Sequence, residues 1–163
     1  MCAALASGEP LPLQQSDLRI HGHAIEARIC AENPDNNFLP ATGTLAVYRK
    51  PACSSFEIPN ASGAGAEVRI DDGVREGDSI SPFYDSMVAK LIVHAPDRPA
   101  ALARMRRALE EFELEGLAST LEFGRWVMDH PAFVEGQFDT GFIAHYFKGA
   151  ESLDAPLPAW KTE

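Results

Sequence analysis

Hydrophobic and polar residues alternate along residues 23–30, the clearest strand pattern in the chain. Successive side chains of a strand point to opposite faces, so Glu26 and Arg28 share one face. The apolar positions of the other face are Ile25, Ala27 and Ile29. The pattern predicts a half-buried strand that carries a charged pair on its open face.

Further segments predict an antiparallel sheet. Turn residues at 33–37 and Gly43 lead into a strand expected over 44–48, and an irregular loop follows at 49–66. Alternation returns at 68–70, and a run of short antiparallel elements with turns at 71–73 and 77–78 closes at 79–82. Residues 87–94 form the most apolar strand pattern and are expected at the centre of the sheet.

Helical periodicity begins after residue 96. Asp97 is a favourable N-cap, and apolar residues recur at helical spacing up to Gly116, where we expect the first helix to end. Glu113 and Glu115 then lie on or beside its polar side, which is the usual place of a solvated acidic run.

Two more helices are predicted. The capping-box spacing of Ser119 and Glu122 opens the second, which ends before Pro131, and a short third helix begins at Asp139. Strands first and helices afterwards predict an α+β fold: a mostly antiparallel sheet in the first two thirds of the chain, followed by two or three helices packed on it.

Composition excludes several classes of function. The chain has 163 residues, 24 acidic against 14 basic side chains and a formal charge of −10, so its surface repels nucleic acid and anionic lipid. The longest apolar run, 87–93, is far shorter than the ~20 residues needed to span a bilayer. Residues 1–6 are too short and lack the basic region of a signal peptide, so the cytoplasm is the expected location. Cys2, Cys30 and Cys53 show no disulfide or zinc spacing.

Few motifs of catalysis are present. No G-x-x-x-x-G-K-[ST] phosphate-binding loop and no G-x-S-x-G nucleophile motif occurs. His21 and His23 could supply half of a zinc site, but further ligands are missing nearby, so a solvated turn is favoured and no metal is expected.

The pair Glu26 and Arg28 allows two interpretations. One is a surface ion pair, worth less than about 1 kcal/mol. The other is that Glu26 holds the Arg28 guanidinium, whose planar fork faces an anion that develops on a substrate.

A second polar cluster, at 84–87, lies just before the central strand. It forms either part of a site or a capped turn.

Together these segments resemble the C-terminal domain of biotin carboxylase. Residues 22–34, GHAIEARICAENP, match the family signature G-H-A-[IVF]-E-x-R-I-x-A-E-[DN]-P. VRID at 68–71, PFYDSM at 82–87 and AKLI at 89–92 match a second block, and DTGFI at 139–143 belongs to a third. Residues 36–43, NNFLPATG, are most similar to carboxylases of the methylcrotonyl-CoA type.

The resemblance implies a set of site residues. Arg28 occupies the position of the arginine that contacts the ureido oxygen of biotin and stabilises the enolate formed when the adjacent nitrogen loses its proton. Asp85 and Tyr84 are implied beside the same biotin site, with Glu26 supporting Arg28. Arg69 falls where related enzymes form a dimer interface.

The resemblance also implies partners. ATP and Mg²⁺ would be bound by an ATP-grasp module that is not part of this chain, and biotin would arrive on a carboxyl carrier domain. A carboxyltransferase subunit and a second copy of the chain are the other expected partners, while nucleic acid and membranes are not. The chain alone is expected to be inactive, and the alternative is a non-catalytic binding or assembly module that keeps the fold.

Three segments are expected on this basis. Residues 1–20 are interpreted as the remnant of a linker from the ATP-grasp module, 21–148 as the domain itself and 149–163 as a tail. Related sequences usually have Thr-Asn where this chain has Ser119 and Thr120. We expect this departure to leave Arg28 untouched.

Overall fold

The computed structural model describes residues 6–8, 10, 14–53 and 67–154, and the linker and tail expectations lie partly outside these ranges. The strands are β1 His23–Cys30, β2 Glu32–Asn33, β3 Leu39–Pro40, β4 Gly43–Thr44, β5 Val47–Arg49, β6 Glu67–Asp72, β7 Ser79–Ile80, β8 Met87–Ala95 and β9 Glu113–Glu115. The α-helices are α2 Arg98–Glu111, α3 Leu121–Asp129, α4 Pro131–Val134, α5 Phe142–Tyr146 and α6 Ala150–Asp154. Single 3₁₀ turns are found at Gln15–Asp17 and Pro34–Asn36.

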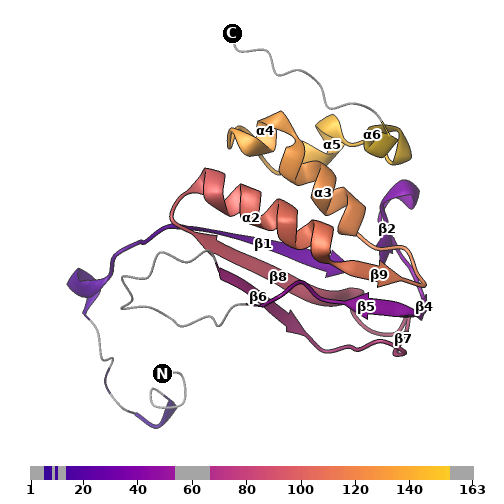
Figure 1. Ribbon diagram of the computed structural model, residues 1–163, viewed down its shortest axis with the longest axis horizontal. Coiled ribbons are helices and arrows are strands. Elements are labelled where there is room, and N and C mark those ends of the chain that lie inside the picture. Colours follow the sequence, from indigo (N-terminus) through magenta and orange to yellow (C-terminus); the bar gives the residue numbers. More distant parts are fainter. Residues whose placement is uncertain (1–5, 9, 11–13, 54–66, 155–163) are drawn as a thin grey trace.

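The main sheet has three antiparallel strands in the order β1-β8-β6. β8 lies in the middle, as its apolar sequence predicts, and α2 runs across one face of the sheet (Figure 1). Short two-stranded pairs, β2-β3, β4-β7 and β5-β9, extend the strand region. The α+β class is confirmed.

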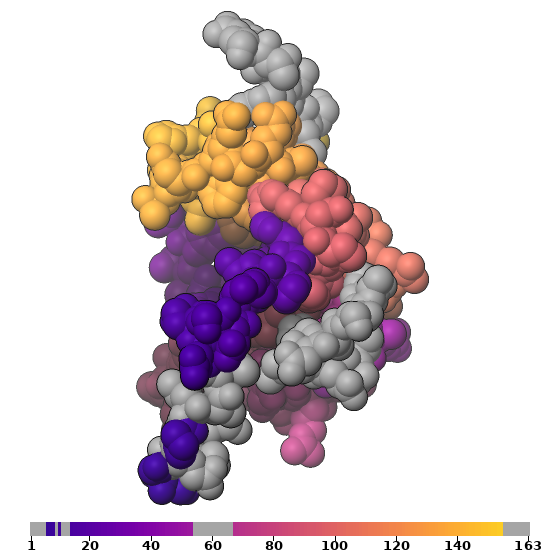
Figure 2. All heavy atoms as spheres, turned by 90° about the vertical axis from the view of Figure 1, so that its left-hand side faces the viewer, coloured from indigo at the N-terminus to yellow at the C-terminus, as the bar shows by residue number. Residues whose placement is uncertain are grey.

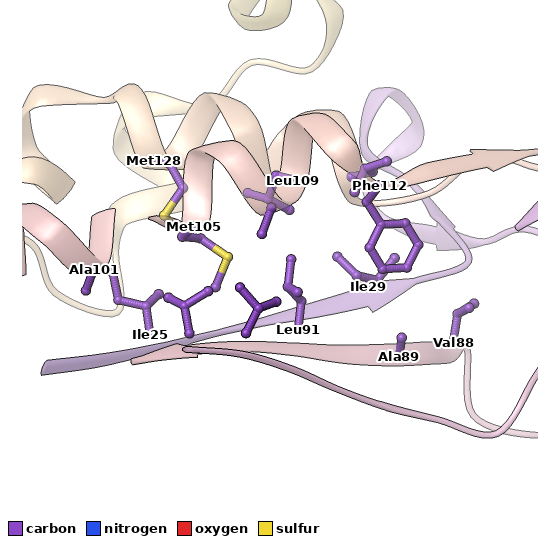
Figure 3. Close-up of a cluster of buried hydrophobic side chains, with 14 of the residues drawn as sticks. Ile25, Ile29, Val88, Ala89, Leu91, Ala101, Met105, Leu109, Phe112 and Met128 are labelled. Carbon is purple, nitrogen blue, oxygen red and sulfur yellow. The ribbon is translucent and has the colours of Figure 1, made fainter. Parts of the chain in front are cut away.

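The core fills the space between this sheet and α2. The fully buried residues of the helix, Ala101, Leu102, Met105, Ala108 and Leu109, recur at three- and four-residue spacing. They pack on the inward residues of the strands, Ile25, Ile29, Val68, Leu91 and Val93. Figure 3 shows Ile25, Ile29 and Leu91 between the sheet and the helix. Each such side chain contributes roughly 1.5–3 kcal/mol by burial, so the inward face of β1 is fixed and its outward face is left for polar residues.

The first helix is shorter than its sequence pattern predicts. The Asp97 side chain caps its N-terminus by accepting from the Ala100 amide at 2.8 Å, as expected. The helix ends at Glu111 instead of Gly116, because Phe112 enters the core and residues 113–115 become β9, which pairs with β5. Glu113 and Glu115 are therefore strand residues, and their predicted place beside the helix was wrong.

The strand predicted over 44–48 is broken in two. β4 pairs with β7, whereas β5 pairs with β9, so the chain changes partner at Leu45 and Ala46. Leu45 exchanges backbone bonds with Gly77 and Asp78, while the Ala46 amide donates to Glu115. Gly116 is required beside this crossing, since it has a φ of 106° and a Cβ there would lie 2.0 Å from the Thr44 carbonyl oxygen.

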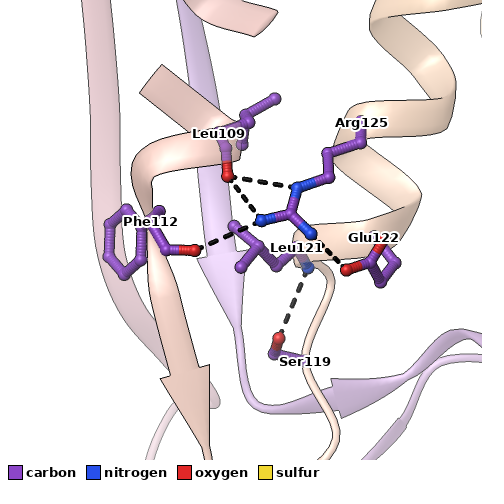
Figure 4. A network of polar contacts seen from close by, with 6 residues as sticks. All are labelled: Leu109, Phe112, Ser119, Leu121, Glu122 and Arg125. Atoms are coloured by element: carbon purple, nitrogen blue, oxygen red, sulfur yellow. Dashed lines mark hydrogen bonds and ion pairs between the residues drawn. The ribbon is translucent and has the colours of Figure 1, made fainter. Parts of the chain in front are cut away.

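Arg125 of α3 joins the two longer helices. Its guanidinium donates to the Leu109 carbonyl at 2.7 and 3.1 Å and to the Phe112 carbonyl at 3.3 Å, and it pairs with Glu122 (Figure 4). The last carbonyls of a helix lack partners within it. Arg125 therefore caps α2 and fixes α3 against its end.

Aromatic side chains hold the later helices together. His130, between α3 and α4, is 2% exposed and lies 4.9 Å from the Trp126 ring and 5.1 Å from the Phe142 ring. Leu153 of α6 packs on this cluster, so the segment predicted as a tail begins with a packed helix. Figure 2 shows residues of α3 to α6, in orange and yellow, gathered at one end of the molecule.

None of the described helices is long and apolar enough to cross a membrane.

Replacing Arg125 tests the cap on α2. Arg125→Met keeps the aliphatic stem but removes the donors, and hydrogen bonds from charged groups are worth about 1.5–3 kcal/mol. We expect the free energy of unfolding to fall by about 2 kcal/mol in urea denaturation of the chain. Arg107→Met is the matched control, because Arg107 is an exposed arginine of α2 that pairs with Glu111, and its midpoint should stay close to that of the parent. Equal losses in both variants would contradict the capping role.

The buried histidine predicts a loss of stability in acid. Burial lowers the pKa of His130, and its Nδ1 accepts a bond from the Ala132 amide, which requires the neutral ring. The unfolded chain therefore binds more protons once the pH falls below about 6.5, the ordinary histidine pKa. We expect the free energy of unfolding to fall as the pH is lowered through about 6.5, with an NMR titration of the His130 ring centred below that value. A ring that titrates at or above it would contradict this assignment.

Candidate functional site

The open face of the main sheet carries a row of charged residues. Antiparallel register places Arg28 of β1 opposite Lys90 of β8, and Lys90 in turn opposite Asp71 of β6. A hollow of about 480 Å³ at the ends of β6 and β8 is lined by residues that include Asp71, Met87 and Lys90. The side of the sheet away from α2 thus presents two neighbouring cations next to an open hollow.

Arg28 projects from this face as its sequence position predicts. Its Nε lies 3.4 Å from Glu26 Oε1, and the two side chains are 67% and 41% exposed. Of the residues that the structure describes, Glu26 is the one that pairs with Arg28, so both terminal nitrogens of the guanidinium are available to a ligand. The pair is weak enough to permit either interpretation given above.

The segment before β8 lies against the end of β1. The Ala31 amide donates to the Ser86 carbonyl at 2.7 Å, and the Ser86 hydroxyl donates to Glu32 Oε1 at 2.5 Å. Asp85 Oδ1 accepts from the Met87 amide at 2.8 Å, so this carboxylate caps a turn and makes no hydrogen bond to Arg28. Tyr84 is 85% exposed. The structure therefore brings the 84–87 cluster to the end of β1 that carries Arg28, with the Tyr84 ring in solvent.

Arg69 is held more firmly than Arg28. On β6 its Nε and a terminal nitrogen donate to both carboxylate oxygens of Asp71, at 2.7 and 2.9 Å. This two-point bond lowers the pKa of Asp71 and raises that of Arg69. Arg69 stands opposite Ile92 of β8, which stands opposite Glu26, so it lies two strands away from the Arg28 edge of the sheet.

Of the two N-terminal histidines, His21 is bonded through its backbone carbonyl and His23 through its ring. The His21 carbonyl accepts from His94 Nε2 at 2.9 Å, and His23 Nε2 accepts from the Arg98 guanidinium at 3.1 Å. Within residues 6–8, 10, 14–53 and 67–154, no group of three His, Cys, Asp or Glu side chains is placed to hold a metal ion.

Cys30, at the end of β1, is a partly buried thiol. Burial is the main cause that raises its pKa, and the neighbouring charge of Glu32 raises it further. A raised pKa keeps the thiol protonated at neutral pH.

Thr120 is a residue near the site that sequence reasoning missed. Its hydroxyl donates to the Arg28 carbonyl at 3.1 Å and accepts from the Cys30 amide at 3.0 Å. The expectation that the departure at Ser119 and Thr120 leaves Arg28 untouched was therefore wrong. No local pattern could have revealed this contact, because the two residues are 92 positions apart in the sequence.

Known proteins share both the sequence and the fold. A family model, described as the biotin carboxylase C-terminal domain, matches residues 26–145. The mitochondrial methylcrotonoyl-CoA carboxylase subunit alpha of Dictyostelium discoideum is 43% identical over 153 residues, which cover 94% of this chain and 20% of that protein. The propionyl-CoA carboxylase alpha chain of Ruegeria pomeroyi is 45% identical over 161 residues, covering 93% of this chain and 24% of the relative.

A solved structure agrees with these sequence matches. The biotin carboxylase domain dimer of Hydrogenobacter thermophilus 2-oxoglutarate carboxylase, in complex with MgADP, ADP and bicarbonate, has a TM-score of 0.79 and 34% identity. The match covers 94% of this chain and 30% of that chain. The chain thus spans less than a third of each of these three relatives. Since the family model and the relatives cover most of its length, the chain belongs to the biotin carboxylase C-terminal domain family.

Proposed function

We propose that this domain supplies part of the biotin site of a biotin carboxylase, within an acyl-CoA carboxylase. The observation that carries the proposal is Arg28, an exposed arginine on the open sheet face whose terminal nitrogens have no partner among the described residues. Family membership favours this role over a non-catalytic assembly module.

Arg28 acts on charge that develops at the ureido oxygen of biotin. As the adjacent ureido nitrogen loses its proton, negative charge gathers on that oxygen, and the guanidinium donates hydrogen bonds to it. The interaction is stronger in the transition state than in the bound ground state, so it lowers the barrier instead of only tightening binding. A planar, permanently charged fork suits this task better than a lysine ammonium.

The neighbouring residues have supporting roles. Glu26 holds the Nε side of Arg28, which turns the terminal nitrogens toward the substrate. Asp85 orders the turn before β8 through the Met87 amide, and Tyr84 stands on that turn as a contact for biotin. Both side chains belong to the segment that is bonded to the end of β1 through Ala31 and Ser86.

The proposal assigns the remaining chemistry to partners. ATP, Mg²⁺ and bicarbonate are handled by an ATP-grasp module, biotin is carried by a carboxyl carrier domain, and a carboxyltransferase subunit receives the carboxyl group. The methylcrotonoyl-CoA and propionyl-CoA carboxylase relatives are 43% and 45% identical to this chain, so neither acyl-CoA is favoured as the acceptor. Unpaired thiols at Cys30 and Cys53 fit a reducing compartment such as the cytoplasm.

Arg28 substitutions test the proposal in the carboxylase that contains this domain. Loss of a transition-state donor costs about two to three powers of ten in rate, and we expect this loss in kcat for biotin carboxylation by Arg28→Ala. Arg28→Lys should recover only part of the rate. The thermal midpoint of both variants should stay near that of the parent, because an exposed ion pair contributes little stability.

Arg49→Ala is the matched control, since Arg49 is an equally exposed strand arginine that pairs with Glu113 away from this face. Its rate should equal that of the parent. An Arg28→Ala enzyme that carboxylates biotin at the rate of the control would remove Arg28 from the mechanism.

We further propose that the chain forms a homodimer through a surface that includes Arg69. Support comes from the dimeric biotin carboxylase domain to which the chain is similar. Arg69→Glu places a second carboxylate on the same face of β6 as Asp71, and like charges across an interface oppose association. We expect at least a ten-fold weaker dimer by sedimentation, whereas Arg107→Glu on the exposed side of α2 should leave association unchanged. Equal association of both variants and the parent would contradict the role of Arg69.

A further inference from the structure

β1 is an edge strand, so its backbone has hydrogen-bonding partners from a strand on one side only. β8 pairs with it along its length, and on the opposite side none of the strands that the structure describes follows in the sheet order. Unpaired backbone groups at partly buried positions are costly. The edge around Arg28 therefore needs another source of donors and acceptors.

Thr120 supplies them. Its hydroxyl donates to the Arg28 carbonyl at 3.1 Å and accepts from the Cys30 amide at 3.0 Å, while its own amide donates to the Cys30 carbonyl at 3.0 Å. Three bonds thus join one residue to the backbone on either side of Ile29. The hydroxyl fills the place that a neighbouring strand would take.

These bonds coincide with an irregularity on the other side of the strand. Ile29 pairs with Ala89 and Cys30 with Met87, so Val88 is the extra residue of a bulge in β8. The regular ladder that fixes Arg28 opposite Lys90 ends at this point. Without Thr120, the backbone of residues 28–30 would be held by strand pairing that is interrupted at this point.

The hydroxyl is not used for the helix that Thr120 begins. Thr120 is the N-cap residue of α3, but its side chain makes no capping bond, and the Leu121 amide donates to Ser119 Oγ at 3.4 Å. Thr120 is also buried, with 9% exposure. Its hydroxyl therefore bonds to the backbone of β1 and not to its own helix.

We propose that Thr120 is a positioning residue that fixes the backbone of Arg28 and so aims its guanidinium. This inference rests on the proposed function of Arg28. A misplacement of about 1 Å costs up to about a hundred-fold in rate, so loosening the Arg28 carbonyl is expected to matter even though Thr120 touches no substrate.

The test uses Thr120→Val and Thr120→Ser in the carboxylase that contains this domain, each with Arg28 and in an Arg28→Ala background. With Arg28 present, Thr120→Val should lower kcat about ten-fold and change KM for biotin less, while Thr120→Ser, which keeps the hydroxyl, should restore most of kcat. In the Arg28→Ala background, Thr120→Val should have no further effect, because it acts through Arg28. Thr44→Val, whose hydroxyl contacts Ser79 in another strand pair, is the control and should match the parent.

The outcomes separate this inference from the proposed function. If Thr120→Val leaves kcat unchanged, or lowers it equally in both backgrounds, Thr120 does not position Arg28 and the inference is overturned while Arg28 keeps its role. If Arg28→Ala alone has no effect, the proposed function fails and the inference fails with it. Thr120→Ala replaces Thr120→Val in the same comparison if the valine variant does not fold.

Hydrogen exchange of this chain tests the bond itself without any activity. The Cys30 amide should exchange at least ten-fold faster in Thr120→Val than in Thr120→Ser, with amides in the middle of β8 unchanged in both. Equal protection of Cys30 in the two variants would overturn the inference by showing that the hydroxyl does not hold this strand.

Discussion

The burial of one sheet face against α2 is the constraint on which the rest of the structure depends. Leu91 and Leu109 are fully buried between the two layers, and Ile29 packs beside them. Because strand side chains alternate, burying Ile29 forces Arg28 onto the opposite face. A slip of one residue would place the guanidinium in the core, so the packing energy of the apolar side chains also enforces the position of the charged one.

Polar side chains complete this arrangement where regular elements end. Arg125 covers the carbonyls at the end of α2, and the Thr120 hydroxyl covers the edge of β1. Both residues come from the region of α3, so one helix is tied to the end of the core helix and to the strand of the candidate site. Apolar packing holds the sheet and α2 together as two layers. The hydrogen bonds of Arg125 and Thr120 fix the position of α3 relative to α2 and to β1.

Local sequence patterns predicted the parts of the fold that repeat. The alternation over 23–30 gave the bounds of β1, and the apolar run that became β8 predicted its central place, because both signals are periodic. The end of α2 was missed because Phe112 continues the helical spacing, although pairing of β9 with β5 withdraws it from the helix. The bond from Thr120 to Arg28 could not be predicted for the same reason, because it joins segments that are distant in the sequence and leaves no local pattern.

The arginines of this chain differ in how firmly the protein holds them, and Arg28 is among those that are held loosely. Arg125 donates to two carbonyls and is part-buried, and Arg69 makes a two-point bond to Asp71. A guanidinium held in these ways must break strong bonds before it can serve a ligand. Arg28 has one long contact, to Glu26, in an exposed pair that costs less than about 1 kcal/mol to disrupt. A residue whose backbone is fixed while its charged end is loosely held can respond to charge that arises only during a reaction.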